Sequence, residues 1–229
     1  MFITAIERDG KRKYRFYIDG EYRFFLTDSD LREYDLFVLI REIVGDNEKI
    51  DNLEVNLKEE VFKSIHDNAV INRGRRYALG LLSDRDYTVK GLTDKLNSVG
   101  YTAEDSESII DYVSGFNYLN DVRYAVNYIR SRESQKSRKY IQNQLMIKGV
   151  SSKDIQQAFD MISEEHEKDG ISNRELTYKA INTAIRRKLK PVDMDNADKV
   201  TKVIASLLRS GYNYSDIKQC LNEYINNDL

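Results

Sequence analysis

The chain has 229 residues, of which 41% are hydrophobic and 32% are charged. This length fits one large domain or two small ones, and the apolar content is enough to form a core without disulfides. The single cysteine, Cys220, cannot form an internal disulfide, and charged residues interrupt the first twenty positions, where a signal peptide needs an apolar stretch. No run approaches about 18 apolar residues, so we expect a soluble, cytoplasmic protein.

The formal net charge of −2 is unevenly distributed along the chain. Residues 1–70 carry 11 basic and 16 acidic side chains, residues 122–149 carry seven basic and one acidic, and residues 177–190 carry five basic and none acidic. Two basic blocks therefore lie within an acidic protein. Such blocks are typical of surfaces that bind acidic protein or nucleic-acid phosphate.

The N-terminal residues predict β-strands, because the segments 2–8, 13–18 and 22–26 are rich in aromatic and β-branched residues. Asp9-Gly10 and Asp19-Gly20 separate these segments, and Asp-Gly is a strong signal for a two-residue type I′ hairpin. We therefore expect a three-stranded meander. Its aromatic side chains form either the core of a small sheet, which is the commoner use, or a face that stacks nucleobases.

After Thr27 the pattern becomes helical. We expect a short helix over residues 29–34, an apolar stretch over 36–43 and an acidic connector that ends at Glu54. A further helix begins near Leu57 and runs toward the segment 72–86. With one proline and 11 glycines in the whole chain, long helices joined by short turns are expected.

Beyond residue 70 the chain repeats itself, in the segments LNSVGYTAED, LMIKGVSSKD and LLRSGYNYSD. In each segment a leucine is followed four residues later by a glycine, and glycine can end a helix in the left-handed conformation. A residue that favours the N-cap lies two positions after each glycine and an aspartate three positions further, which resembles a capping box. The glycines are Gly100, Gly149 and Gly211, the caps Thr102, Ser151 and Asn213, and the aspartates Asp105, Asp154 and Asp216.

The helix after each cap keeps the same register, because Ile109, Ala158 and Cys220 align in one column that faces a core. Cys220 is thus interpreted as a buried apolar residue rather than a nucleophile. We predict a mainly α fold of tandem three-helix repeats that form an elongated curved array, with a small N-terminal β-meander. The expected domains are the meander and acidic connector over 1–56, a linking helix and first repeat over 57–117, a second repeat over 118–170 and a third over 171–229.

One segment resembles a known family. GFNYLNDVRYAVNYIRSR, residues 115–132, resembles the most recognisable motif of the RecX family, which Asp121, Arg123, Tyr124 and Ala125 match. The segments RRYALGLLSDRDYTVKGLTDKLNSVGY and YIQNQLMIKGV on either side are similar to the first and second repeats of that family. The resemblance covers about residues 75–162 well and the third repeat more weakly, and the strands and connector before them depart from the compact form.

The resemblance implies a monomeric modulator of the RecA recombinase, which lies in the groove of a RecA filament on DNA. It would limit filament growth, RecA ATP hydrolysis and strand exchange in DNA recombination, repair and the SOS response. The alternative is a helical module that binds single- or double-stranded nucleic acid directly, without a RecA partner. Either partner would contact the basic blocks, where the expected binding residues are Arg130, Arg132, Lys136, Arg138, Lys139, Lys148, Arg186, Arg187 and Lys188.

The sequence does not predict an enzyme. His66 and His166 are the only histidines, and each is interpreted as a solvated residue on a helix face, because no metal-ligand spacing surrounds either. No phosphate-binding glycine motif occurs, and adjacent acids such as Glu59 and Glu60 point to different sides of a helix. We therefore expect no catalytic residues, no metal and no cofactor.

Overall fold

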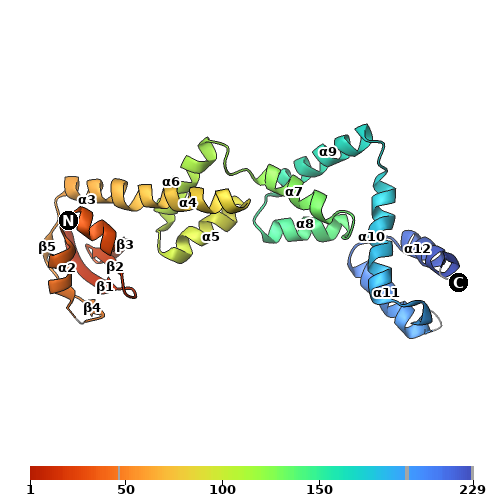
Figure 1. The fold of residues 1–229 in the computed structure, drawn as a ribbon, viewed down its shortest axis with the longest axis horizontal. Helices are drawn as coiled ribbons and strands as arrows, with labels where there is room; N and C mark the ends of the chain where they lie inside the picture. Colours follow the sequence, from red (N-terminus) through yellow and green to blue (C-terminus); the bar gives the residue numbers. More distant parts are fainter. Residues whose placement is uncertain (46, 194–195, 228–229) are drawn as a thin grey trace. The chain divides into compact units, whose positions relative to one another are not determined.

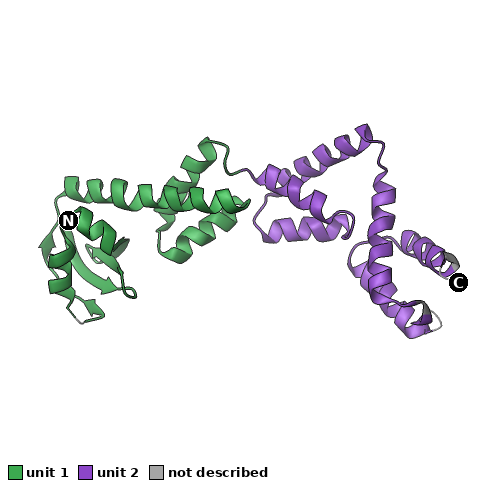
Figure 2. Ribbon diagram, in the orientation of Figure 1, with its two compact units in different colours: residues 1–119 green, residues 120–229 purple. Residues whose placement is uncertain are grey.

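The computed structural model describes residues 1–45, 47–193 and 196–227. It divides into two compact units, residues 1–119 and 120–229 (Figure 2). A small antiparallel sheet lies near the N-terminus and helices form most of the remainder (Figure 1), which confirms the predicted fold class. The curved array and the domain limits stay predictions. No described helix is long and apolar enough to cross a membrane.

The sheet contains the predicted meander and two short strands that were not predicted. β1 (Phe2–Arg8), β2 (Lys13–Ile18) and β3 (Glu21–Thr27) form the meander, and β4 (Lys49–Ile50) and β5 (Val55–Asn56) both pair with β1. All the pairings are antiparallel. The expected acidic connector thus supplies part of the sheet, and strands of two residues are too short to show an alternating pattern.

The two predicted Asp-Gly hairpins have different outcomes. Asp19 and Gly20 have φ of 50° and 87° and join β2 to β3 directly, as a type I′ turn requires. The prediction for Asp9-Gly10 was wrong, because four residues separate β1 from β2 and only Gly10 has a positive φ. The carboxylate of Asp9 instead lies 3.0 Å from the amine of Lys13 and 3.1 Å from the guanidinium of Arg15.

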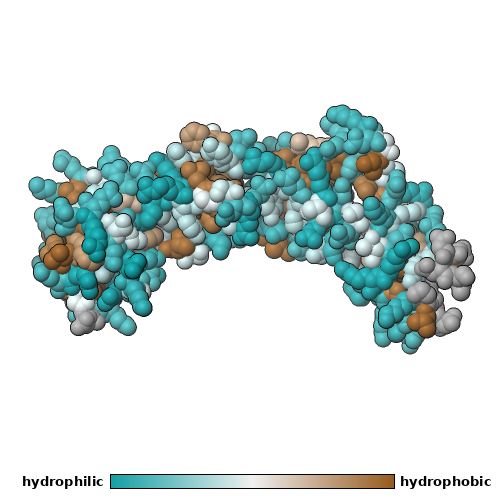
Figure 3. Space-filling model, in the orientation of Figure 1, coloured by the Kyte–Doolittle hydropathy of each residue, from teal (hydrophilic) through white to brown (hydrophobic). Residues whose placement is uncertain are grey.

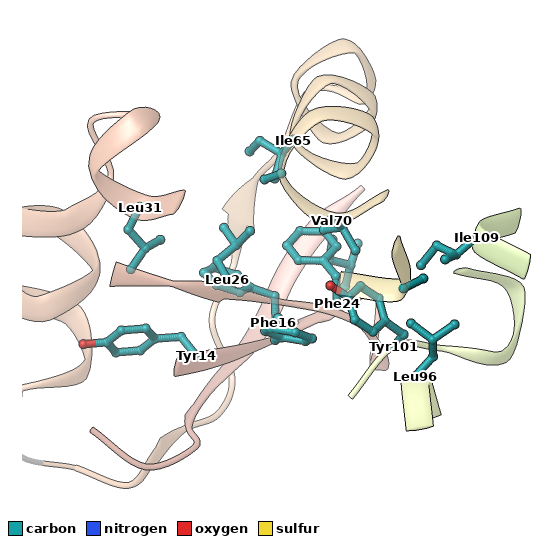
Figure 4. Close-up of a cluster of buried hydrophobic side chains, with 14 of the residues drawn as sticks. Tyr14, Phe16, Phe24, Leu26, Leu31, Ile65, Val70, Leu96, Tyr101 and Ile109 are labelled. Carbon is teal, nitrogen blue, oxygen red and sulfur yellow. The ribbon is translucent and has the colours of Figure 1, made fainter. Parts of the chain in front are cut away.

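The aromatic side chains of the sheet form a core rather than an exposed stacking face. Tyr14, Phe16 and Phe24 are each 2% exposed. They belong to one hydrophobic cluster with Val70 and Tyr101, which lie far along the chain (Figure 4). The nucleobase-stacking interpretation is therefore wrong for these residues.

The helices of the first unit begin with α1 (Asp28–Glu33), which is close to the predicted segment, and α2 (Phe37–Val44). α3 (Glu59–Ile65) continues through a π-helical turn, His66–Ile71, into α4 (Asn72–Asp84). The predicted long helix is therefore confirmed, and it contains an unpredicted π-helical turn. α5 (Val89–Val99) and α6 (Ala103–Gly115) complete the first repeat.

The second unit contains the two remaining repeats. α7 (Asp121–Arg132), α8 (Arg138–Ile147) and α9 (Ser152–Lys168) form one hydrophobic cluster. α10 (Asn173–Lys188), α11 (Ala197–Arg209) and α12 (Tyr214–Asn227) form another, and the 3₁₀ turn Pro191–Asp193 follows α10. These bounds confirm that the described residues after 70 are helical in groups of three.

The turn inside each repeat follows from its glycine, as predicted. Gly100, Gly149 and Gly211 have φ of 106°, 89° and 91°. The residue after each glycine donates its N–H to the carbonyl five residues earlier, which is the Schellman arrangement. Thr102 and Asp105 then form a complete capping box, and Ser151 accepts from the N–H of Asp154 at 3.1 Å.

The aligned apolar columns are buried as expected. Ile109, Ala158 and Cys220 are each 0% exposed. Burial raises the pKa of the Cys220 thiol to about 11, so the thiol is protonated at neutral pH and packs as an apolar side chain.

Candidate docking surface

The basic residues of the second unit gather at the ends of helices. Arg130 and Arg132 lie in the last turn of α7, and Arg138 and Lys139 open α8. Arg186, Arg187 and Lys188 form the last turn of α10, and Arg209 lies in the last turn of α11. The partial negative charge at a helix C-terminus favours such cations, which explains why three of these helices tolerate them there.

The start of α8 contacts the turn that follows α11. Ser137 caps α8 by accepting from the N–H of Tyr140 at 3.1 Å, and its hydroxyl also donates to the carbonyl of Ser210. A Cβ at Gly211 would lie 2.7 Å from Cδ of Lys139, so the aliphatic stem of Lys139 covers that glycine. The second repeat is thus joined to the third beside both basic blocks.

Lys188 lies where the two basic blocks meet. Its amine donates to the hydroxyl of Ser206 on α11. Burial lowers the pKa of Lys188, and the positive charges of Arg187, Arg209 and Lys136 lower this pKa further. No acidic group contributes to this shift. We call Lys136, Arg187, Lys188 and Arg209 the basic cluster.

The sequence predicted three members of the basic cluster but not their proximity, and it did not select Arg209. Lys136 and Lys188 are 52 positions apart in the sequence, and the packing of α11 against α8 and α10 brings them together. Arg209 lies beyond both basic blocks in the sequence, so counting charges in those blocks gives no signal for it. A search for cations in the last turn of predicted helices finds it, because Gly211 marks the end of α11.

Other predicted binding residues have contacts within the second unit. Arg130 forms an ion pair of 2.6 Å with Glu165. Lys148 lies 5.8 Å and Arg132 5.9 Å from the ring centroid of Tyr128. The guanidinium of Arg138 lies 4.1 Å from the ring centroid of Phe159, a residue of the buried columns. Arg138 therefore covers the core.

Beside Arg138 lies a cavity of about 170 Å³ that contains the second histidine. His166 is only 7% exposed, so its interpretation as a solvated residue was wrong. Its Nε2 lies 3.3 Å from Glu133 Oε1, and its Nδ1 is buried without a hydrogen-bond partner. Burial raises the pKa of Glu133, although His166 opposes this shift. Helix α9 turns this face toward α7, a packing that the local sequence does not reveal.

The first histidine also has a specific partner, so it is not a simple solvated residue. His66 Nε2 lies 2.7 Å from Asp105 Oδ1, and the ring stacks on Phe62 at 5.7 Å. Asp105 is 2% exposed. The hydrogen bond with Asp105 raises the pKa of His66. Burial alone would raise the pKa of Asp105, but hydrogen bonds from His66 and Thr102 lower it. This pair ties the π-helical turn to the capping box of α6.

No group of three or more His, Cys, Asp or Glu side chains among the described residues converges as a metal site would require. The chemistry of the basic cluster is that of an anion-binding surface, which suits the phosphate of nucleic acid or the carboxylates of a protein.

Comparison with known proteins shows similarity to the RecX family. A family model described as RecX, second three-helix domain, matches residues 120–158. The regulatory protein RecX of Clostridium tetani is 26% identical over 231 residues, which cover 99% of this chain and 95% of that protein. The regulatory protein RecX of Clostridium botulinum is 25% identical over 229 residues, with 99% and 98% covered. The chain is thus similar to RecX proteins along nearly its whole length. Its resemblance at residues 115–132 is thereby confirmed.

Solved RecX structures support the fold. A crystal structure of a regulatory protein RecX has a TM-score of 0.56 and 22% identity, and covers 96% of this chain and 98% of that chain. The crystal structure of RecX from Lactobacillus salivarius has a TM-score of 0.50 and 24% identity over 67% of this chain and 95% of that one.

The RecX motif residues begin α7 in the second unit. Asn120 caps the helix by accepting from the N–H of Arg123 at 2.9 Å, and Asp121 lies in the first turn, where the helix dipole favours an acid. Ala125 is fully buried, and Tyr124 stacks on Tyr128 at 6.4 Å. The motif thus starts and packs the helix whose last turn carries Arg130 and Arg132.

Proposed function

We propose that this protein regulates the RecA recombinase by binding its filament on DNA, and that it limits filament growth, ATP hydrolysis and strand exchange. The observation that carries the proposal is the similarity to proteins named regulatory protein RecX along 99% of the chain. We place the protein in the cytoplasm, where the filament forms, and propose that it acts as a monomer without catalytic residues or a cofactor.

The basic cluster is the proposed contact with the filament. The positive charges of Arg187, Arg209 and Lys136 lower the pKa of Lys188, so an anionic partner that offsets this repulsion gains affinity at the cluster. The other predicted basic residues, Arg130, Arg132, Arg138, Lys139, Lys148 and Arg186, are proposed to support this contact by their charge. Those among them that pack on Phe159 or Gly211 are poor choices for substitution, since a loss of binding would be mixed with a loss of structure.

The decisive experiment is charge reversal of the cluster. A variant with Lys136→Glu, Arg187→Glu, Lys188→Glu and Arg209→Glu is expected to bind a preassembled RecA filament at least about tenfold more weakly. The same variant should suppress RecA ATP hydrolysis and strand exchange only at a correspondingly higher concentration. Wild-type binding should weaken as salt rises, because the attraction is screened.

The matched control carries the same change in charge at four exposed lysines outside the cluster: Lys11→Glu, Lys63→Glu, Lys95→Glu and Lys153→Glu. It is expected to bind within about twofold of the wild type. If the two variants suppress RecA equally well, the cluster is an ordinary solvated surface. If the wild type itself has no effect on RecA, the proposed function is wrong.

The second candidate is direct binding of nucleic acid, and the basic cluster also favours this function because phosphate is an anion. Binding to bare single-stranded and double-stranded DNA, measured in parallel with binding to the filament, separates the two. Equal affinity for bare DNA and for the filament, with no effect on RecA activity, would establish the direct-binding function instead.

A further inference from the structure

Helix α6 of the first unit carries an exposed stripe that the basic cluster does not explain. Residues 104, 108, 112 and 116 follow one another at intervals of four, so they lie along one side of the helix, whereas Ile109 and Val113 on the opposite side are buried. We define the acidic-aromatic stripe by this side and the acids next to it. Its members are Glu104, Glu107, Ser108, Asp111, Tyr112 and Phe116.

Aromatic rings form the C-terminal end of the stripe. Tyr112 is 36% and Phe116 58% exposed, and their ring centroids are 5.1 Å apart in an edge-on arrangement. The guanidinium of Arg75 lies 4.4 Å from the ring centroid of Tyr112 and holds this ring in place. Hydrophobic surface is visible over this end of α6 (Figure 3). Rigid, exposed aromatic side chains are typical anchors of protein interfaces.

The N-terminal end of the stripe is acidic and borders a cavity. α6 contains four carboxylates, Glu104, Asp105, Glu107 and Asp111, and no cation. Asp105 is paired with His66, but none of the other three forms an ion pair with another described residue. Glu104 and Ser108 line a cavity of about 440 Å³ together with Asp67 and Arg75. The Nε of Arg75 is buried without a hydrogen-bond partner, which leaves a donor for a carbonyl group.

We propose that the acidic-aromatic stripe docks a segment of a partner protein in which basic side chains flank a large apolar one. The apolar side chain would pack on Tyr112 and Phe116, and the basic side chains would reach Glu107, Asp111 and the mouth of the cavity. A single strand of nucleic acid fits less well, because stacked bases on these rings would bring phosphates toward three unpaired carboxylates. The stripe therefore differs from the basic cluster in the charge of its partner.

The inference rests on the proposed function in one respect, which is that the RecA filament serves as the probe. Two variants separate the two ends of the stripe. One combines Tyr112→Ala with Phe116→Ser, and the other combines Glu107→Lys with Asp111→Lys. Glu104 is retained because an acid in the first turn stabilises the helix. The matched controls, all at exposed positions of the same unit, are Val38→Ser with Leu39→Ser, and Glu42→Lys with Glu54→Lys.

Each stripe variant is expected to bind the preassembled filament at least about tenfold more weakly than the wild type, and each control within about twofold. Circular dichroism and urea unfolding establish that the variants are folded. Filament binding unchanged in folded stripe variants would overturn the inference and leave the proposed function intact. If the aromatic variant instead loses affinity for bare single-stranded DNA as much as for the filament, the stripe stacks nucleobases and the protein-docking proposal is wrong. A wild type that does not bind the filament refutes the proposed function, and this inference with it.

Discussion

Replacing Gly74 with alanine measures how closely α4 approaches α6 in the first unit. Gly74 is buried inside α4, where alanine normally stabilises a helix by about 1 kcal/mol relative to glycine. A Cβ at this position would lie 2.2 Å from Cδ1 of Ile109 and 3.0 Å from Cε1 of Tyr101. Ile109 is 0% and Tyr101 5% exposed, so neither side chain has free space to enter.

The size of the effect follows from a comparison within the same helix. Gly80 also lies in α4, but a Cβ there would meet nothing within 4 Å. Gly80→Ala is therefore expected to stabilise by about 0.5–1 kcal/mol. Overpacking of a filled core costs about 1–3 kcal/mol, so Gly74→Ala should be less stable than Gly80→Ala by that amount. The intrinsic helix propensity of alanine is the same in both variants, so it cancels in the difference between their free energies of unfolding.

The assay is urea unfolding of the two variants and of a double-mutant cycle. Ile109→Val removes the methyl group nearest to the new Cβ, and alone it should cost about 0.5–1.5 kcal/mol. Combined with Gly74→Ala it should cost less than the sum of the single changes, because the clash is relieved. If Gly74→Ala is as stable as Gly80→Ala, or if the two changes are simply additive, α4 and α6 do not pack as described.

Two further predictions concern the pH dependence of the first unit and the turn after α11. The pKa of His66 is raised from 6.5 and that of Asp105 is lowered from 3.8. The pair therefore contributes its full stability between pH 3.8 and pH 6.5. This contribution is lost as the pH rises through the folded pKa of His66, and also as the pH falls through the folded pKa of Asp105. Urea unfolding of His66→Gln should therefore show a smaller loss of stability between pH 6 and 9 than the wild type shows, and parallel curves would contradict the pairing. Gly211→Ala should destabilise more than Gly170→Ala, since both glycines have positive φ but only at Gly211 would the Cβ meet another side chain, Lys139. Equal losses in the two alanine variants would show that Lys139 does not cover Gly211.

The parts of the fold that depend on residues close together in the sequence were predictable. A glycine at the end of an apolar helical pattern, followed by an N-cap residue, identifies the turns at Gly100 and Gly149, because both signals lie within a few positions. The burial of Cys220 followed from the same register. The strands β4 and β5 were missed because they pair with β1 from more than 40 positions away and are too short to show a pattern. The prediction of a two-residue hairpin at Asp9 was wrong. The loop there is longer, and the Asp9 carboxylate forms ion pairs with Lys13 and Arg15.

The candidate site depends both on the charge composition of the sequence and on contacts between segments that are far apart in it. Charge counting found the two basic blocks, because an excess of cations is a property of composition. It did not show that Lys136 and Lys188 belong to one surface, since their proximity depends on Ser137 and Lys139 of α8 reaching Ser210 and Gly211 after α11. The burial of His166 was hidden for the same reason, because the cavity that it lines also includes Glu133 after α7, Arg138 of α8 and Leu176 of α10.

The contact between α8 and the turn after α11 also explains how repeats with weak mutual similarity share one charged surface. The Schellman turn at Gly211 leaves the carbonyl of Ser210 free to accept from Ser137, and a glycine without a Cβ leaves room for the stem of Lys139. The turn that ends α11 thus also contacts the start of α8. Cations at helix ends on both sides of this contact, Lys136 before α8 and Arg209 in the last turn of α11, are consequently brought to the same place as Lys188. A glycine selected for a local turn therefore determines a long-range electrostatic feature, which is why the basic cluster depends on the turn as much as on its own four residues.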